Sequence, residues 1–306
     1  MSHSLGKLKK YRNIRGSEGV ALMKLKAVPV DIKTFLRGPG EMRTASPRDI
    51  RQLIREDRFV GNTSGFSLGY LQGNLVILPA EYAVDFFRYC QRNPKPCPLV
   101  GVSDTGVPAL PDLGSDIDIR TDIPTYNIFR NGELSEQVTN IKDLWRDDFI
   151  TFVLGCSYTF EHALMNEGVR LRHIDEDKTV PMYCTNIQTT PAGPFSGSTV
   201  VSMRSLSVEK AIRAIEITSR FPQAHGAPIH FGDAKEIGIK DLSKPDWGDP
   251  TEIRTGEVPV FWACGVTPQA AIQNAKPSIC ITHAPGNMLI TDISGMDAGR
   301  GSSRSP

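Results

Sequence analysis

The sequence predicts an α/β protein in which a layered main domain carries a smaller α+β domain as an insertion. Short apolar runs typical of buried strands alternate along the chain with amphipathic stretches typical of helices, the order expected of an α/β layer. From Gly114 the pattern changes to alternating polar and apolar residues around a hairpin turn. We therefore assign residues 45–113 and 189–293 to the main domain and residues 114–188 to the inserted domain.

The first part of the main domain contains two predicted helices and two predicted strands. A helix from Ser46 to Arg55 has a capping serine and a proline at its first position. Residues 70–79 form an apolar run typical of a buried strand, and residues 80–90 continue as a helix. Residues 98–103 complete this part as a second strand.

The inserted domain is predicted to hold a hairpin and a long helix. Residues 116–122 alternate in polarity, and residues 126–132 end in an Asn-Gly turn after which the chain pairs back. A helix is expected from about Asp143 to Glu167, with short strand and loop after it.

The main domain then resumes with further alternating elements. Residues 198–204 and 258–264 are predicted strands, and residues 207–216 form a predicted helix capped by its first serine. Residues 278–286 form a last strand that ends in polar residues and a turn.

The two ends of the chain differ from the rest. Seven Lys or Arg residues face only Glu18 in the first thirty residues, so residues 1–44 are either a mitochondrial presequence or a disordered basic tail. Glycines in this segment weaken an amphipathic helix, which favours the tail. Residues 294–306 are rich in Gly, Ser and Arg and are expected to be disordered.

The composition excludes several kinds of partner. With 306 residues, of which 40% are hydrophobic and 23% charged, the chain can bury a sizeable core. Its net charge of +1 gives no general attraction to nucleic acid or anionic membranes, and no apolar run approaches the roughly 20 residues of a membrane helix. We expect no nucleic-acid or membrane partner, and a homo-oligomer stays open.

The six cysteines favour reduced thiols over a disulfide framework, because they are scattered through a long chain. Cys90 and Cys97 are separated by two prolines, a poor spacing for zinc. No nucleotide-binding or dinucleotide-binding motif is present. We predict a cytoplasmic protein, or one of the mitochondrial matrix if the basic start is a presequence, with no metal and no cofactor.

The stretch from Ser219 to Asp233 is the first candidate for a functional site. Two histidines, two prolines, two glycines and an aspartate within fifteen residues cannot form one regular element, and we expect a loop, a short strand at 227–230 and a turn. Such residues suit either a small-molecule site or two tight turns with solvated histidines.

Polar residues also follow other predicted strands, at Arg204, Cys264 and His283. Because the carboxyl ends of strands in an open α/β sheet face the ligand crevice, we expect these side chains to converge on one edge with His230. Alternatives stay open: Arg204 could instead pair with Asp233.

Histidine suits acid–base catalysis near neutral pH, and arginine suits a bidentate contact with a substrate carboxylate. Cys156, Cys184 and Cys264 could be nucleophiles, although a buried thiol is usually inert.

Many segments between residues 46 and 293 resemble the D-glutamate cyclase family. They are residues 58–65 (RFVGNTSG), 74–79 (NLVILP), 92–99 (RNPKPCPL), 145–148 (WRDD), 155–157 (GCS), 180–186 (VPMYCTN), 225–230 (HGAPIH), 256–269 (GEVPVFWACGVTPQ) and 282–286 (THAPG). The resemblance implies a two-domain α/β fold and the reversible dehydration of D-glutamate to 5-oxo-D-proline, formally a hydro-lyase step.

This reaction needs a nucleophilic amine, a protonated leaving oxygen and a clamp on the other carboxylate. Our hypothesis divides these tasks among nine residues. His230 is the acid–base group supported by Asp233, with Cys264 and His283 also in the catalytic set; Arg204 binds the α-carboxylate, with Asn186, Asn62, Ser64 and His225 in the substrate-binding set. The alternatives are a hydro-lyase for another hydroxy or amino acid, and a non-catalytic regulatory module that binds a small carboxylate.

Overall fold

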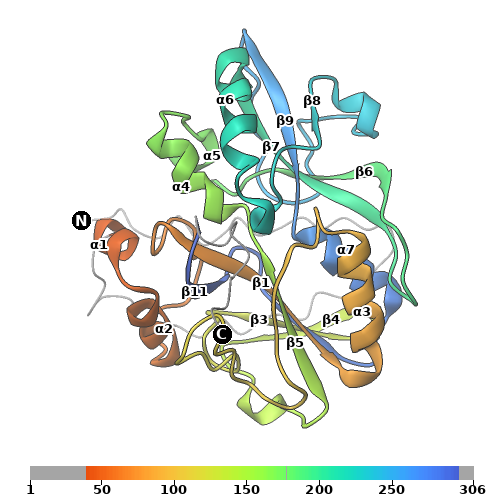
Figure 1. The fold of residues 1–306 in the computed structure, drawn as a ribbon. Helices are drawn as coiled ribbons and strands as arrows, with labels where there is room; N and C mark the ends of the chain where they lie inside the picture. The colour runs from red at the N-terminus through yellow and green to blue at the C-terminus, as the bar shows by residue number, and fades with distance from the viewer. Residues whose placement is uncertain (1–38, 177, 296–306) are drawn as a thin grey trace, which may run out of the picture. The chain divides into compact units, whose positions relative to one another are not determined.

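Two antiparallel sheets form the frame of the computed structural model, which describes residues 39–176 and 178–295 (Figure 1). The seven strands of the large sheet are β1 (Tyr70–Pro79), β2 (Leu99–Val102), β3 (Tyr126–Arg130), β4 (Glu133–Val138), β5 (Phe149–Gly155), β10 (Cys280–His283) and β11 (Leu289–Ser294). Their order is β2-β5-β1-β10-β3-β4, with β11 also paired to β1. The small sheet has the order β6-β7-β9-β8, formed by β6 (Met182–Gln188), β7 (Ser198–Ser207), β9 (Glu257–Ala263) and β8 (His230–Phe231).

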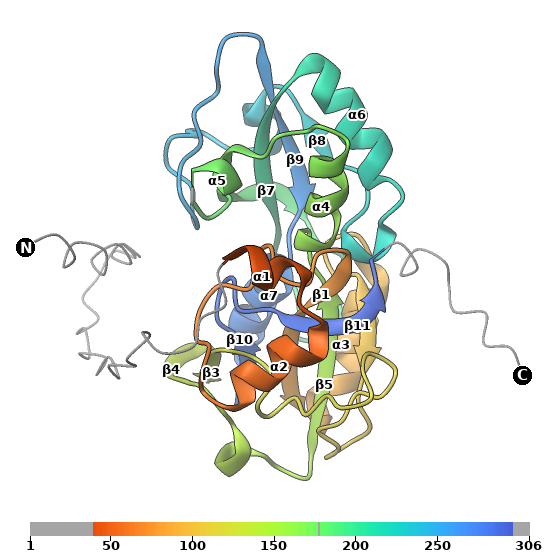
Figure 2. The same cartoon turned by 90° about the vertical axis from the view of Figure 1, so that its left-hand side faces the viewer.

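Helices cover faces of both sheets (Figures 1 and 2). The α-helices are α1 (Pro39–Thr44), α2 (Pro47–Arg55), α3 (Ala80–Arg92), α4 (Tyr158–Asn166), α5 (Arg172–Asp175), α6 (Val208–Thr218) and α7 (Val266–Ala275); the short 3₁₀ helices are η1 (Lys142–Leu144), η2 (Pro222–Ala224) and η3 (Ala234–Ile237). Phe86 of α3 and Ile272 of α7 are buried with Val76 on one face of the large sheet. α4 and α6 enclose Trp262 on one face of the small sheet. Complete burial of a large apolar side chain such as Phe86 contributes about 1.5–3 kcal/mol.

Several predicted elements are confirmed, and with them the α/β class. The Ser46 hydroxyl accepts a hydrogen bond from the Asp49 N–H (3.2 Å) and caps α2. β1 has the predicted bounds. The Ser207 hydroxyl accepts from the Lys210 N–H (3.3 Å) and caps α6.

The predicted helix from Asp143 to Glu167 is wrong. Most of its first half is β5, and only α4 within it is an α-helix. β5 pairs along its length with β1, with Gly155 opposite Gly73 at one end. Its aromatic and β-branched residues suit a buried strand, and the long-range pairing with β1 decides between strand and helix.

The structure does not confirm the domain insertion. Strands β3, β4 and β5 lie within the predicted domain at 114–188, yet they belong to the large sheet together with β1. Residues 116–122, predicted as an alternating strand, form turns with one bridge from Asp118 to Ala109. The predicted boundaries therefore do not separate one sheet from the other.

The predicted tails are shorter than expected where they are described. Residues 39–44 form α1, and Met42 is buried against α2 and β11 in one apolar cluster. Ser294, the first residue of the predicted C-terminal tail, ends β11. Residues 1–38 and 296–306 of the predicted tails lie outside the described residues, and so does the presequence hypothesis.

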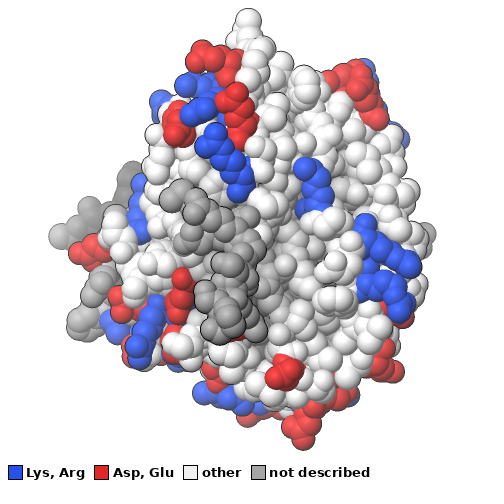
Figure 3. All heavy atoms as spheres, viewed as in Figure 1, with Lys and Arg blue, Asp and Glu red and all other residues white. Residues whose placement is uncertain are grey.

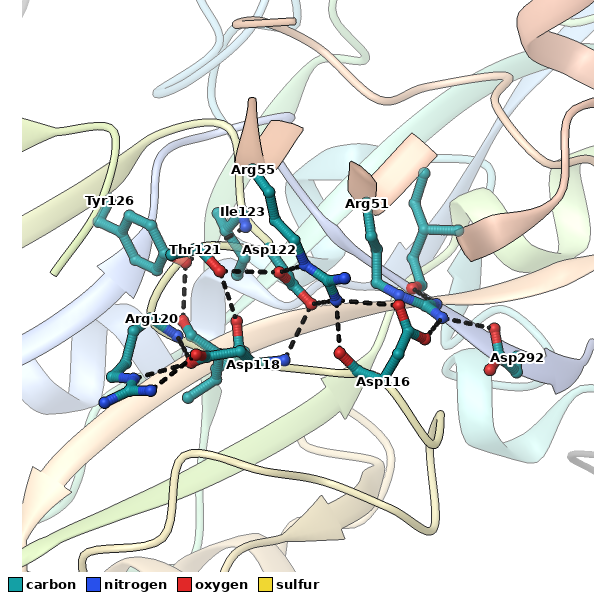
Figure 4. Close-up of polar contacts among 12 residues, drawn as sticks. Arg51, Arg55, Asp116, Asp118, Arg120, Thr121, Asp122, Ile123, Tyr126 and Asp292 are labelled. Carbon is teal, nitrogen blue, oxygen red and sulfur yellow. Dashed lines mark hydrogen bonds and ion pairs between the residues drawn. The ribbon is translucent and has the colours of Figure 1, made fainter. Parts of the chain in front are cut away.

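A buried ionic network holds α2 to the loop at 116–122 and to β11 (Figure 4). The Arg51 guanidinium pairs with Asp116 and Asp292, and it donates to the Ile290 carbonyl (2.8 Å). The Arg55 guanidinium donates to both carboxylate oxygens of Asp122, at 2.6 Å each. We call Arg51, Arg55, Asp116, Asp122 and Asp292 the α2 network.

Within the described ranges no helix has the length and apolar character needed to cross a membrane. The same part of the chain holds no group of three or more His, Cys, Asp or Glu side chains arranged to bind a metal ion.

Candidate functional site

The expected convergence of strand ends on one sheet edge is wrong, because every strand pair in the described part of the chain is antiparallel. Neighbouring strands therefore place their carboxyl ends at opposite edges. The nine residues of the hypothesis fall into three groups: Arg204, His225 and Cys264; Asn62, Ser64 and His283; and His230, Asp233 and Asn186.

His230 lies on the other face of the small sheet from Arg204. It stands opposite Phe261 in β9, and its ring packs on the Phe261 ring at 5.7 Å between centroids. Phe261 also stands opposite Met203, the residue before Arg204 in β7. Because side chains alternate between the faces of a strand, Arg204 and His230 point to opposite sides.

The third group, His230, Asp233 and Asn186, makes hydrogen bonds typical of turns. The His230 Nε2–H donates to the Asp233 carbonyl (2.9 Å), and the Asp233 carboxylate caps η3 by accepting from the Lys235 N–H (3.0 Å). Asn186 is exposed and donates to the Glu236 carbonyl (3.4 Å).

The second group borders β1. Asn62 accepts a hydrogen bond from the Ser64 N–H (2.7 Å). His283 is buried, and its Nδ1 accepts from the Leu75 N–H (3.0 Å). Nδ1 is therefore unprotonated and the ring proton is on Nε2. Burial lowers the pKa of His283 to about 4, so the ring is neutral at pH 7.

The first group is where the structure brings most charged and reactive side chains together. Arg204 and Glu161 are each 3% exposed, and His173 is also buried. His225, Cys156 and Cys264 lie within electrostatic reach of the Arg204 guanidinium. We call Arg204, Glu161, His173, His225, Cys156 and Cys264 the central cluster.

Arg204 of β7 is held by one carboxylate, two hydroxyls and two aromatic rings. Its guanidinium pairs with Glu161 and donates to the hydroxyls of Ser157 and Ser202, at 3.1 Å each. The Phe160 and Trp262 rings lie 5.4 Å and 5.2 Å from its central carbon, within cation–π range. Its Nε–H has no hydrogen-bond partner among the described residues.

Glu161 of α4, and not Asp233, is the partner of Arg204. Its carboxylate also lies 3.1 Å from the His173 Nε2. Burial alone would raise the pKa of Glu161, but the charges of His173 and Arg204 outweigh burial and lower this pKa to about 2. Glu161 is therefore ionised and fixes the guanidinium in place.

His225 joins two of the segments that carried the family resemblance. It follows η2 with a φ of 75°, and its Nδ1 lies 2.9 Å from the carbonyl oxygen of Lys95. Because a carbonyl oxygen only accepts, Nδ1 carries the proton and Nε2 keeps its lone pair. Burial, reinforced by the charges of Arg204 and Lys95, lowers the pKa of His225 to about 4. At pH 7 it is a neutral histidine with an acceptor nitrogen.

The two cysteines precede helices. Cys156 lies two residues before the first residue of α4, and Cys264 two residues before that of α7. Burial raises the pKa of Cys156 to about 12 and also raises the pKa of Cys264. The positive charge of Arg204 lowers both pKa values, but by less than burial raises them. Both thiols are protonated at neutral pH.

Sequence reasoning missed Glu161 and His173. A signal for Glu161 was present, because it lies on the helix between the apolar residues Phe160 and Leu164, where a carboxylate needs a buried partner. No local pattern identifies His173.

Narrow cavities flank the Arg204–Glu161 pair. One of about 10 Å³ is lined by Tyr158, Glu161 and residues 65–70, and another of about 10 Å³ by His173, Arg204 and Ser205. Each has the volume of about one water molecule. A wider cavity of about 520 Å³ shares Ser205 with the second and is lined by four basic side chains, those of Arg170, Arg172, Lys210 and Arg254.

Comparison with known proteins bears directly on this cluster. Residues 150–292 match the model of the D-glutamate cyclase family, a stretch that contains every residue of the central cluster. A protein of Dinoroseobacter shibae named "putative hydro-lyase" is 59% identical over 245 residues, covering 80% of this chain and 82% of its own.

Further relatives have the same name. One from Verminephrobacter eiseniae is 57% identical over 268 residues (88% of this chain, 97% of its own), and one from a Thermoanaerobacter species is 56% identical over 247 residues (81% and 93%). A solved nitrogen repressor-like protein from Methanococcus jannaschii is 8% identical with a TM-score of 0.32, covering 77% of this chain and 91% of its own, which is too low to support any argument.

Proposed function

This chain belongs to the D-glutamate cyclase family, and from that membership we propose that it interconverts D-glutamate with 5-oxo-D-proline and water at the central cluster. At the level of reaction class the family is one of hydro-lyases. The named relatives are bacterial, so the proposal places the protein in the cytoplasm rather than in a mitochondrion.

The observation that carries the proposal is the buried guanidinium of Arg204, whose Nε–H has no partner among the described residues and whose charge acts on a neutral histidine, His225. The substrate keeps one carboxylate throughout the reaction, and guanidinium groups bind carboxylates with directional, charge-assisted hydrogen bonds. Glu161 occupies one side of Arg204 and fixes its orientation, which leaves Nε–H as the donor for the α-carboxylate.

His225 supplies the proton transfers. Ring closure moves two protons from the substrate ammonium to the oxygen that leaves the γ-carboxyl group as water. The Nε2 lone pair of the neutral His225 takes a proton from nitrogen and passes it to the departing oxygen, once for each proton. As these protons move, the amine nitrogen bonds to the carbonyl carbon of the γ-carboxyl group and the carbon–oxygen bond to the departing water breaks, so atoms and charge balance.

The matched test compares the two histidines on opposite faces of the small sheet. Formation and hydrolysis of 5-oxo-D-proline are followed by chiral chromatography in wild type, His225→Gln and His230→Gln. We expect His225→Gln to lower kcat by roughly 10²–10⁴-fold, the usual contribution of a general acid–base group, and His230→Gln to keep wild-type turnover. Loss of activity in His230→Gln alone would move the site to the other face of the sheet.

Absence of turnover by wild type with either enantiomer would reject the reaction itself. In that case the same protein is offered a panel of hydroxy and amino acids with water loss read by mass spectrometry. Turnover of a different acid would then assign the hydro-lyase to that substrate.

A further inference from the structure

Two thiols of the central cluster take no part in ring closure, and they are placed alike. Cys156 and Cys264 each stand one residue before the N-cap of an α-helix, nine residues long for α4 and ten for α7. The backbone N–H of Tyr158 lowers the pKa of the Cys156 thiol, and the backbone N–H of Val266 lowers the pKa of the Cys264 thiol. Each helix N-terminus therefore stabilises negative charge on or near its thiol.

Asn74 of β1 holds the two cysteine loops together. Its Nδ2 donates to the Gly155 carbonyl (2.9 Å), next to Cys156. A Cβ on Gly265, next to Cys264, would lie 2.4 Å from the same amide nitrogen, so the Gly265 backbone rests directly on Asn74.

Each thiol is also anchored to a different sheet. The Cys156 N–H donates to the Gln72 carbonyl of β1, and the Cys264 N–H donates to the Val200 carbonyl of β7, at 3.0 Å each. The Cys264 sulfur lies 3.5 Å from the Met182 sulfur of β6. Neither thiol depends on a free loop for its position.

Arg204 lies within electrostatic reach of both thiols, and its buried Nε–H has no partner among the residues described. A substrate carboxylate on that Nε–H would bind a group that interacts electrostatically with both thiols. A negative charge developing on this carboxylate and the carbon that bears it would meet a guanidinium and two helix N-termini.

We propose that Cys156 and Cys264 form an acid–base pair that removes and replaces the proton on the carbon bearing the substrate carboxylate, so that the site also racemises a small α-amino acid or its lactam. This inference rests on the proposed function for its substrate class. Because both resting thiols are protonated, one of them first releases its proton. The thiolate so formed takes the proton from the carbon: the carbon–hydrogen bond breaks, an S–H bond forms, and the electron pair stays on the carbon and its carboxylate. The other thiol then gives its proton to the opposite face of the carbon. Nothing is oxidised or reduced, and the two sulfurs finish with their protonation exchanged.

The electrostatics of the pair favour one thiolate beside one thiol. A charge on Cys264 raises the pKa of Cys156, so when one thiol ionises the other holds its proton more firmly. Burial raises the pKa of both, which makes either thiolate a stronger base once it forms.

Deuterium exchange tests the pair separately from ring closure. The full chain is incubated in D₂O with 5-oxo-D-proline or D-glutamate, deuterium at the α carbon is measured by NMR and mass spectrometry, and enantiomers are separated by chiral chromatography. We expect wild type to incorporate α-deuterium and to form the other enantiomer. Cys156→Ser and Cys264→Ser should each lower racemisation at least ~100-fold. Cys184→Ser, a change at an exposed cysteine outside the cluster, should match wild type.

The wild-type measurement decides the proposal even where a serine variant fails to fold. Ring closure without α-deuterium in wild type would overturn the thiol pair and leave the proposed function standing. Exchange of the α-proton without ring closure would support the pair and reject the proposed function. Exchange that persists unchanged in a folded double variant, with both cysteines replaced by serine, would also overturn it.

Discussion

Two buried arginines, Arg51 and Arg204, show how differently one side chain can be used in this molecule. Both are within 3% of complete burial, and in both the Nε–H lacks a hydrogen-bond partner within the described ranges. A missing partner alone therefore does not identify a ligand site.

What separates the two arginines is the charge around them. The α2 network supplies three carboxylates for two guanidinium groups, so an anion entering it would meet a surplus of negative charge (Figure 4). Around Arg204 the one carboxylate is Glu161, and the other neighbours are hydroxyls, aromatic rings, protonated thiols and a neutral histidine. The first arrangement stabilises the fold, while the second is the one to which our proposal assigns the binding of a small acid.

Ion pairs on the surface are weaker than those of the two buried arginines. On the face shown in Figure 3, Lys and Arg lie beside Asp and Glu in mixed patches. Among the exposed ion pairs of the protein is that of Arg146 with Asp148 (2.6 Å). Exposed pairs of this kind contribute about 0–1 kcal/mol to the free energy of unfolding. A surface ion pair would therefore not replace the contribution of either buried arginine.

The largest expected effect is on catalysis at Arg204. Arg204→Met removes the carboxylate-binding group, and kcat/KM for 5-oxo-D-proline should fall by roughly 10³-fold, the scale seen when one charge-stabilising donor is removed. Steady-state kinetics on the folded fraction measures it. Arg51→Met is the control and should keep wild-type kcat/KM per folded molecule; an equal loss in both variants would remove the distinction between the two arginines.

Arg51→Met should instead lower the free energy of unfolding. It leaves Asp116 and Asp292 without their guanidinium. Breaking a fully buried ion pair by removing one partner costs about 3–5 kcal/mol, and the partial exposure of both aspartates makes this value an upper limit here. Urea unfolding followed by circular dichroism gives the free energy of unfolding. Arg88→Met, at an exposed pair with Asp85, should change it by less than about 1 kcal/mol.

Two buried histidines, His225 and His283, should make the free energy of unfolding decrease as the pH is lowered. The pKa of His225 and of His283 drops from 6.5 to about 4 on folding, so between these pH values the unfolded chain binds protons that the folded chain does not. Each contribution is fully present above pH 6.5 and is lost as the pH falls to 4, by about 3 kcal/mol per histidine.

Unfolding titrations between pH 7.5 and 4 measure this loss in wild type, His225→Gln and His283→Gln. Each variant should have a flatter pH dependence than wild type, because one depressed pKa is gone. Unchanged slopes in these two variants would contradict burial as the cause.

The smallest expected effect concerns the close backbone contacts around the central cluster. A Cβ on Gly155 would lie 1.6 Å from the Gln223 carbonyl oxygen, so Gly155→Ala must shift η2 and the adjoining His225. Overpacking of this kind costs about 1–3 kcal/mol. Gly101→Ala is the control, since its Cβ would meet a terminal methyl group of the Leu113 side chain at 2.7 Å instead of a backbone atom. Thermal unfolding compares the two, and a larger loss in Gly101→Ala would contradict the argument.

Much of the fold follows from local pattern, and the exceptions have a common cause. Capping serines and apolar periodicity predict α2, β1 and α6 with nearly correct bounds. β5 was predicted as helix because an apolar run of its length fits either structure, and its pairing with β1 joins residues 70 (Pro79 with Phe149) to 82 (Gly73 with Gly155) positions apart. Sheet direction and the joining of β3 to β5 with β1 are likewise set by long-range pairing.

The candidate site divides in the same way. Arg204 and Cys264 were predicted from their positions at strand ends and His225 from a loop rich in proline and glycine, and the structure brings these three together. His230 was chosen over His225 from local spacing, which does not reveal the face of the sheet to which a side chain points. Glu161 was missed because its significance depends on a partner more than forty residues away.

The left-handed backbone of His225 has a consequence for engineering this protein. A side chain other than glycine in that conformation costs about 1–2 kcal/mol, so His225→Gly would relieve strain at the very position proposed to move protons. Selection for thermal tolerance alone would favour that replacement, whereas selection for turnover would oppose it. A library randomised at residue 225 can be selected separately for thermal tolerance and for turnover. We expect glycine to be enriched at this position by the first selection and histidine alone to survive the second.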